Sequence, residues 1–172
     1  MNKAIFLDRD GTINIDYGYI HDISKFTFID RAIDGLKILR DMGYTLIIIT
    51  NQSGISRGYY KLKDYEIVNK YMLDSLSKEG INISKVYMCP HQDKDNCNCR
   101  KPKLELFYRA IEEFNIDIKE SYVIGDKERD LALCDKEDIK GILLSNEINN
   151  KYICKTSLYE AAIYIKNVKN LE

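Results

Sequence analysis

Two aspartates follow a short apolar segment near the start of the chain. Residues 3–7 form this segment, and Asp8, Asp10 and Gly11 come next within the motif D-x-D-G-T. Side chains two residues apart on an extended strand project to the same side, so the two carboxylates can share one site, and Gly11 allows a sharp turn behind them. One carboxylate of such a pair can act as a nucleophile while the other transfers protons. The alternative interpretation is a plain polar turn.

Polar side chains also follow two later apolar segments, residues 44–49 and 121–124. These side chains are Thr50, Asn51, Gln52 and Ser53 after the first segment, and Asp126 and Asp130 after the second. The hydroxyl and amide groups of the first set can donate hydrogen bonds to an oxyanion, and the second set adds two carboxylates. Taken alone, the first set is also ordinary loop composition and the second is also typical of helix capping.

A group of cysteines precedes the dipeptide Arg100-Lys101. The residues of ligand type are Cys89, His91, Cys97 and Cys99, spaced as C-x-H and C-x-C. Three thiolates and one imidazole meet the tetrahedral requirement of structural zinc, and reduced cysteines without a ligand are the alternative. A metal here would also fix Arg100 and Lys101 over the strand ends. The total of five cysteines excludes a fully paired disulfide framework, and we expect Cys134 and Cys154 to be buried packing thiols.

The pattern of apolar residues indicates which elements must position these groups. Strands are expected at residues 3–7, 44–49, 85–88, 121–124 and 141–144, and amphipathic helices at 32–42, 65–76, 104–114 and 157–168. Continuously apolar strands that alternate with helices predict a doubly wound parallel sheet of the α/β class, covered on both faces. Ligands bind outside the carboxyl ends of such strands, where the polar motifs stand. The length of 172 residues favours a single domain, residues 1–172.

Composition restricts the class of partner. Lys and Arg number 26 against 27 Asp and Glu, so the formal net charge of −1 argues against a general nucleic-acid binder. No apolar run is long enough for a membrane span or for the core of a signal peptide, which predicts a cytoplasmic protein without a membrane partner. We expect a monomer.

In combination, the motifs resemble those of a known superfamily. Asp8-x-Asp10-Gly11-Thr12, Thr50-Asn51, Lys101-Pro102 and Gly125-Asp126 with Asp130 occur in the order found in the haloacid dehalogenase superfamily of phosphohydrolases. Together with the cysteine loop at 89–99 and the segment 50–58, the chain from about residue 3 to about residue 144 is similar to the D-glycero-D-manno-heptose-1,7-bisphosphate 7-phosphatases. The resemblance implies a Rossmann-like domain of the haloacid dehalogenase type, without a large cap domain and with a zinc-binding loop insertion.

The resemblance and the residue chemistry together imply a phosphatase mechanism. Asp8 is expected to attack phosphorus and form an aspartyl phosphate, while Asp10 protonates the leaving sugar oxygen and later deprotonates water. Mg²⁺ would bind the carboxylates of Asp8 and Asp126 and the backbone carbonyl of Asp10. Thr50 and Lys101 would hold the phosphoryl oxygens.

The substrate implied by the resemblance is a sugar bisphosphate. The residues expected to contact it are Asp16, Tyr17, Gly18, Tyr19, Asn51, Gln52, Ser53, Arg100 and Lys127. Arg57, Arg100 and Lys127 are the available cations for its second phosphate, and the sequence leaves open which of them binds it. Histidinol phosphate is the alternative substrate, because the phosphatases that act on it share these motifs. A non-catalytic, zinc-stabilised binding module is the remaining alternative, and the near-zero net charge disfavours a nucleic-acid 3′-phosphatase.

Overall fold

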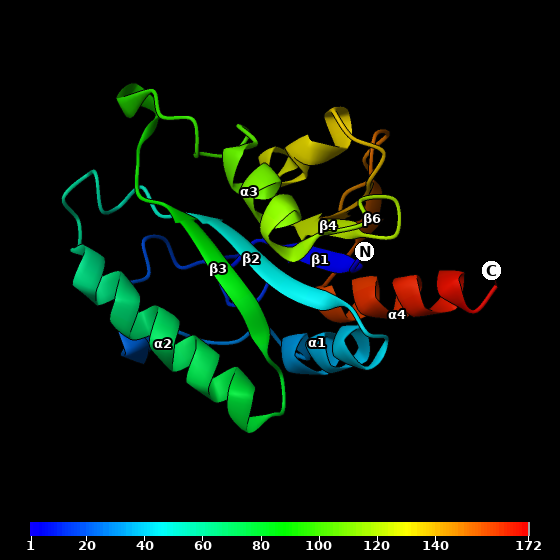
Figure 1. The fold of residues 1–172 in the computed structure, drawn as a ribbon. Helices are drawn as coiled ribbons and strands as arrows, with labels where there is room; N and C mark the ends of the chain where they lie inside the picture. Colours follow the sequence, from blue (N-terminus) through cyan, green and yellow to red (C-terminus); the bar gives the residue numbers. More distant parts are fainter. Residues whose placement is uncertain (172) are drawn as a thin grey trace.

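The protein is built around one six-stranded parallel sheet (Figure 1). The structure is a computed structural model that describes residues 1–171. In spatial order the strands are β3 (Ile83–Cys89), β2 (Thr45–Asn51), β1 (Ala4–Leu7), β4 (Tyr122–Gly125), β5 (Lys140–Leu144) and β6 (Ile153–Lys155). Because every pairing is parallel, the carboxyl ends of all strands meet at one edge.

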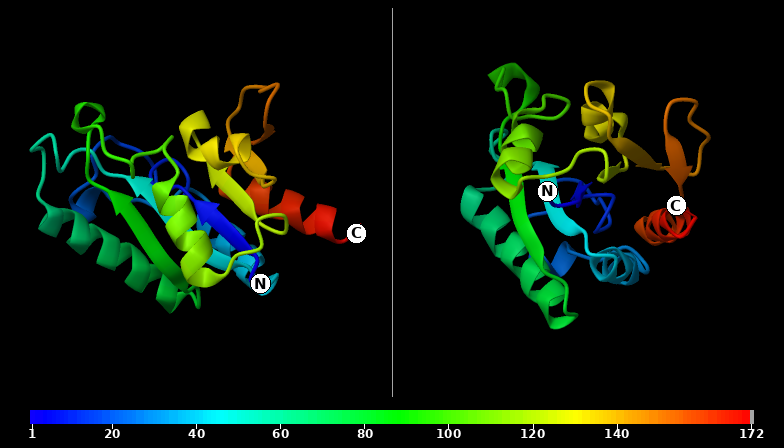
Figure 2. Two further views of the ribbon diagram at one scale, coloured as in Figure 1. Left: turned by 45° about the horizontal axis from the view of Figure 1, so that its top comes forward. Right: turned by 45° about the vertical axis from the view of Figure 1, so that its right-hand side comes forward.

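Helices cover both faces of the sheet, as Figures 1 and 2 show from three directions. One face carries α1 (Ala32–Asp41), α2 (Leu62–Lys78) and α4 (Leu158–Lys169), and the other carries α3 (Glu105–Phe114) and the 3₁₀ helix η3 (Glu128–Asp135). Two short 3₁₀ turns, η1 (Ile23–Lys25) and η2 (Asp93–Asp95), lie in the loops. This is the doubly wound α/β architecture that the sequence predicts.

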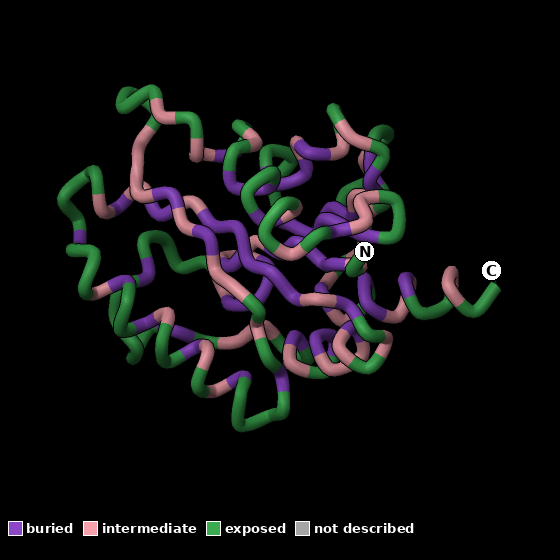
Figure 3. Tube along the Cα trace, in the orientation of Figure 1, coloured by how far each residue is buried: buried purple, intermediate pink, exposed green. Residues whose placement is uncertain are grey.

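The central strand β1 shows why an uninterrupted apolar segment is needed. Ile5 and Leu7 pack in the layer of α1, α2 and α4, whereas Ala4 and Phe6 pack in the layer of α3. All four residues of β1 are buried, and Figure 3 shows that burial is concentrated along the central strands. Alternate side chains of a strand face opposite sides, so a strand covered on both sides has no polar position.

Two helices of the first layer approach each other closely. A Cβ atom on Gly35 of α1 would lie 3.0 Å from the carbonyl oxygen of Leu158 and 3.0 Å from the Cα of Tyr159, both in α4. Glycine at this position therefore sets the distance between the two helices. The N-terminus of α4 is capped by Ser157, whose Oγ accepts a hydrogen bond from the backbone N–H of Glu160 at 3.2 Å.

The structure differs from the sequence prediction in three places. A sixth strand, β6, pairs with β5 at the edge of the sheet; its three residues are too few to give a periodic signal. The segment after Asp126 forms a 3₁₀ helix rather than an α-helix. Cys134 and Cys154 are half-buried beside a small cluster of Leu131, Leu143 and Tyr152, not fully enclosed. Within residues 1–171, no helix has the length and apolar character to cross a bilayer.

Candidate active site

A cavity of about 430 Å³ opens at the carboxyl ends of the central strands. The sequence-predicted residues that line it are Asp8, Asp10, Asp16, Gly18, Tyr19, Asn51, Gln52, Ser53, Arg57, Arg100, Lys127 and Asp130. Thr50 and Lys101 are buried and do not line the cavity, and Tyr17 is exposed outside it. Because parallel strands end at one edge of the sheet, residues from four separate parts of the chain lie together there.

Lys101 joins two carboxylates beside the cavity. Its Nζ lies 2.7 Å from Asp8 Oδ1 and 2.8 Å from Asp130 Oδ1, and it donates to the backbone oxygen of Ile49 at 2.6 Å. Burial would lower the pKa of Lys101, but the two carboxylates raise it above its usual value. Burial raises the pKa of Asp8, and the neighbouring carboxylates of Asp130 and Asp10 raise it further against the opposing effect of Lys101. The group carries more negative than positive charge.

Asp126 supplies a further carboxylate that has an unused oxygen. Its Oδ1 is buried and has no hydrogen-bond partner within residues 1–171, and burial, together with Asp130, raises its pKa to about 6. Gly11, at φ +85°, leaves room for this side chain, because a Cβ there would lie 2.4 Å from Asp126 Oδ2. One oxygen from each of Asp8, Asp126 and Asp130 lies within 4.8 Å of the others. An excess of negative charge and an unpaired carboxylate oxygen fit a hard divalent cation such as Mg²⁺.

Asp10 is held by hydrogen bonds on both oxygens. Arg9 donates from its guanidinium to Oδ2 at 3.1 Å and to Oδ1 at 3.0 Å, Asn14 donates to Oδ1 at 2.9 Å, and Gln52 donates to Oδ2 at 2.9 Å. Arg9 and Asn14 are completely buried, and the sequence reasoning missed both. No local pattern marks Arg9 as buried, since arginine is almost never enclosed unless it is paired.

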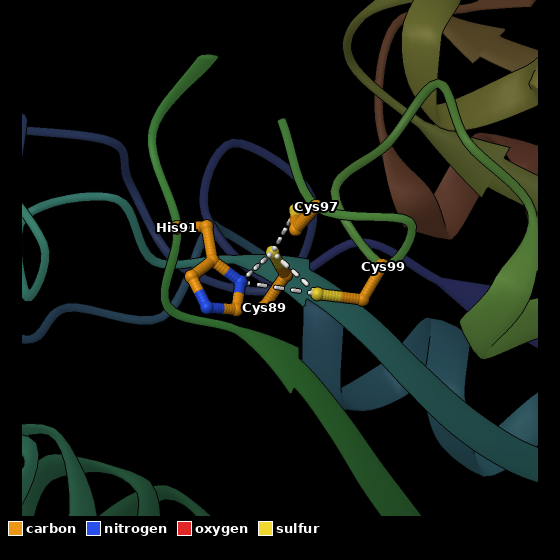
Figure 4. Close-up of side chains that lie close together, drawn as sticks. All are labelled: Cys89, His91, Cys97 and Cys99. Atoms are coloured by element: carbon orange, nitrogen blue, oxygen red, sulfur yellow. Dashed lines mark hydrogen bonds between the residues drawn. The ribbon is translucent and has the colours of Figure 1, made fainter. Parts of the chain in front are cut away.

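The four residues of the cysteine cluster converge as their spacing predicts (Figure 4). Cys89 Sγ lies 3.0 Å from Cys99 Sγ, 3.7 Å from Cys97 Sγ and 3.6 Å from His91 Nδ1. Burial alone would raise the pKa of Cys97, but hydrogen bonds from the Arg100 backbone and the neighbouring cysteines lower it to about 7. All five cysteines are free. Three sulfurs and one imidazole nitrogen around one point fit a closed tetrahedral zinc site.

The cysteine loop is attached to the cavity by polar contacts. Arg100 donates to Asp93 Oδ1 at 2.8 Å and to the backbone oxygen of His91 at 3.3 Å. Asn51 binds the backbone of Lys101 twice, at 3.0 Å and 3.1 Å, which ties the residue after Arg100 to the end of β2. Residues of the loop therefore hold the Arg100 guanidinium, and Asn51 of β2 holds the Lys101 backbone; that a metal fixes both cations stays a prediction.

Cationic side chains surround the rest of the cavity. Arg57, Arg100, Lys127 and Arg129 contribute to its wall, and sequence reasoning did not include Arg129. Lys127 lies 3.4 Å from Asp16, which also accepts a hydrogen bond from the backbone N–H of Gly18 at 2.9 Å. Five aspartates share the lining with these four cations, and Arg100 and Lys127 are paired with Asp93 and Asp16. An anionic ligand would therefore bind through individual cations and not through a net positive charge of the cavity.

Known proteins are similar to this chain over most of its length. The family model described as polynucleotide kinase 3 phosphatase matches residues 3–166. A D-glycero-beta-D-manno-heptose-1,7-bisphosphate 7-phosphatase of Haemophilus influenzae is 48% identical over 137 residues, which cover 76% of this chain and 74% of that protein. A relative of the same name from Helicobacter pylori is 47% identical over 144 residues, 83% of each chain. The chain belongs to the D-glycero-D-manno-heptose-1,7-bisphosphate 7-phosphatase family.

Membership in this phosphatase family confirms the expected class of enzyme, a phosphoric monoester hydrolase. The fold is confirmed as well. The crystal structure of a D,D-heptose 1,7-bisphosphate phosphatase from B. bronchiseptica, complexed with magnesium and phosphate, has a TM-score of 0.87 and 22% sequence identity, and the match covers 96% of this chain and 99% of that one. The haloacid dehalogenase type of sheet is therefore shared by the two proteins.

Proposed function

We propose that this chain hydrolyses the 7-phosphate of D-glycero-D-manno-heptose 1,7-bisphosphate with Mg²⁺ as cofactor. The observation that carries the proposal is the group of Asp8, Lys101 and Asp126 beside a cavity with a cationic rim. A buried nucleophile with cation ligands serves phosphoryl transfer, and a cationic rim serves a substrate with a second phosphate. The names of relatives up to 48% identical support the same substrate.

Asp8 is the proposed nucleophile. One of its oxygens forms a bond to phosphorus as the bond from phosphorus to the sugar oxygen breaks, which leaves an aspartyl phosphate. Lys101, 2.7 Å from Asp8 Oδ1, fixes the carboxylate and offsets part of the negative charge at the reacting group. Asp8, Asp126 and the backbone carbonyl of Asp10 would hold Mg²⁺, which would supply the positive charge that a carboxylate needs to approach a phosphate dianion.

Asp10 is proposed to move the protons. It gives one proton to the sugar oxygen as that oxygen leaves, and it then takes one proton from the water that attacks the aspartyl phosphate. The second step breaks the bond between Asp8 and phosphorus, and it regenerates Asp8 and releases inorganic phosphate. Thr50 and Lys101 are proposed to hold phosphoryl oxygens during both steps.

The rim of the cavity is proposed to select a bisphosphate. Arg57, Arg100, Lys127 and Arg129 are candidates for the second phosphate, because guanidinium groups bind phosphate with two parallel hydrogen bonds. The residues proposed to contact the sugar are Asp16, Tyr17, Gly18, Tyr19, Asn51, Gln52 and Ser53. Of these, Tyr17 lies outside the cavity wall, so its contact would need a substrate that reaches beyond the rim.

Zinc is proposed to be bound by Cys89, His91, Cys97 and Cys99 and to have a structural role. All four donors belong to the protein, which leaves no position for substrate. Its effect on catalysis would come through Arg100, whose guanidinium is held by Asp93 and by the backbone of His91 within the same loop.

Phosphate release from the heptose bisphosphate, compared with release from histidinol phosphate, tests the proposal. Both anomers of the bisphosphate are assayed with and without Mg²⁺, and Asp8→Asn serves as the control. We expect a higher kcat/KM for the bisphosphate, dependence on Mg²⁺ and no turnover by the variant. A higher kcat/KM for histidinol phosphate would overturn the substrate, and equal turnover by Asp8→Asn would overturn the nucleophile.

A further inference from the structure

Two buried side chains outside the Asp8–Asn14 turn connect to Asp10. Tyr60, which is 6% exposed, donates its hydroxyl hydrogen to Gln52 Oε1 at 2.7 Å. Gln52, which is 3% exposed, donates from Nε2 to Asp10 Oδ2 at 2.9 Å and to Thr50 Oγ1 at 2.9 Å. A continuous chain of hydrogen bonds thus runs from Tyr60 to Asp10.

The surrounding groups determine which way the amide of Gln52 is turned. Arg9 donates to Oε1 at 3.4 Å, and Asp10 presents a carboxylate oxygen to the other end of the amide. A reversed amide would set its oxygen against that carboxylate and its NH₂ group against the Arg9 guanidinium, so both contacts would be repulsive. Burial raises the pKa of Tyr60 to about 12, with Arg9 acting against the shift, so the hydroxyl keeps its proton and acts as a donor.

Tyr60 is itself held firmly in place. A Cβ on Gly54 would lie 2.1 Å from Cε1 of the Tyr60 ring, so only glycine permits the ring to lie there. A second contact comes from His21, whose ring stacks on Tyr60 with a centroid distance of 5.1 Å and an angle of 8° between the planes. A turn in which Tyr59 N–H donates to the Gly54 oxygen at 2.9 Å closes this loop.

We propose that Tyr60, acting through Gln52, is a positioning residue that holds the Asp10 carboxylate at the cavity. The inference rests on the proposed role of Asp10 in proton transfer. Of the three side chains that donate to Asp10, Arg9 and Asn14 belong to the same turn and move with it, whereas Gln52 lies at the end of β2. The contact from Gln52 is therefore the one among the three that ties the Asp10 side chain to the end of β2, and Tyr60 keeps the Gln52 amide turned toward Asp10.

Tyr60→Phe tests the proposal, because it keeps the stacked ring and removes only the hydroxyl. Gln52 Oε1 then keeps only the 3.4 Å bond from Arg9. Tyr60 also lines the cavity, but its hydroxyl hydrogen is donated to Gln52 and its ring is kept in the variant. We therefore expect kcat for a sugar phosphate to fall about tenfold while KM stays within about twofold. The first-turnover burst of p-nitrophenolate from p-nitrophenyl phosphate should stay within about twofold of wild type, because this leaving group departs without a proton.

Tyr59→Phe is the matched control. Its ring contacts Tyr19, its hydroxyl has no hydrogen bond within residues 1–171, and its side chain does not line the cavity, so we expect wild-type kinetics. Gly54→Ala keeps the hydroxyl but displaces the Tyr60 ring, and it should reproduce the Tyr60→Phe kinetics. Thermal unfolding of each variant shows whether it is folded at the assay temperature.

Three results would overturn the inference: an unchanged kcat in folded Tyr60→Phe, a change confined to KM, or an equal loss on the sugar phosphate and in the aryl phosphate burst. None of them depends on which sugar phosphate is used. A wild-type enzyme that cleaves other sugar phosphates but not the heptose bisphosphate would contradict the proposed substrate alone.

Discussion

Replacing Lys101 with methionine should destabilise the protein far more than an ordinary surface substitution would. Lys101 is 2% exposed, and its ammonium group lies within 2.8 Å of the carboxylates of Asp8 and Asp130 and of the Ile49 carbonyl oxygen. Methionine has a similar length and fills the same volume, so the change removes charge and donors with little loss of packing. Two buried carboxylates would then lie side by side without a counter-ion.

The size of the expected destabilisation follows from the burial of the Lys101 ammonium group and its partners. Removing one partner of a buried ion pair costs about 3 to 5 kcal/mol, because the remaining charge is left uncompensated. A protein of this size loses about 2 to 4 °C of Tm per kcal/mol, so the expected drop is roughly 6 to 20 °C. Lys70→Met is the matched control: Lys70 pairs with Asp74 at 2.6 Å, but its side chain is 75% exposed, and such pairs contribute less than about 1 kcal/mol.

The stability of both variants is measured by urea and thermal unfolding in Mg²⁺-free buffer. Unfolding is followed by far-ultraviolet circular dichroism, because the chain contains no tryptophan for fluorescence. Adding Asp130→Asn to the Lys101→Met variant should recover part of the loss, because one of the two unpaired charges disappears. If Lys101→Met unfolded at the same urea concentration as Lys70→Met, the reasoning about this buried charge group would be refuted.

Three further outcomes are expected. Gly35→Ala should destabilise the protein by about 1 to 3 kcal/mol in urea unfolding, because its Cβ meets the backbone of α4 at 3.0 Å, and an unchanged midpoint would contradict that close approach. Metal analysis should find about one zinc atom per chain in the wild type and less in Cys97→Ser. The variant should also have a higher KM, because Arg100 would be less ordered. A wild-type protein without zinc would contradict the metal assignment. Arg129→Ala should raise KM about tenfold for the bisphosphate but leave KM for a sugar monophosphate unchanged, and an equal rise for both would exclude a contact with the second phosphate.

The groups that local patterns could predict are those with a fixed spacing. The convergence of Asp8 and Asp10 was predictable because period-two geometry at a strand end places both on one side. The cluster of Cys89, His91, Cys97 and Cys99 was predictable because four residues of ligand type fall within eleven residues. The parallel sheet followed from continuous apolar strands such as β1, whose alternate residues serve two different layers. In each of these cases the physical constraint acts within a few residues of sequence.

Long-range contacts account for what sequence reasoning missed. Arg9 is buried because Asp10 and Gln52 surround it, and Gln52 lies 43 residues away. Tyr60 stands in a loop with no periodicity, and only the folded chain brings its hydroxyl to Gln52. The three residues of β6 form a strand only because β5 offers an edge to pair with.

The proposed mechanism requires that Asp8 is phosphorylated during turnover. Rapid mixing of the enzyme with Mg²⁺ and D-glycero-D-manno-heptose 1,7-bisphosphate, followed by acid quenching and peptide mass spectrometry, tests it most directly. We expect one phosphoryl group on the peptide that contains Asp8, formed before phosphate is released and absent from Asp8→Asn. Release of phosphate by an enzyme whose Asp8 peptide stays unmodified at every quench time would contradict it.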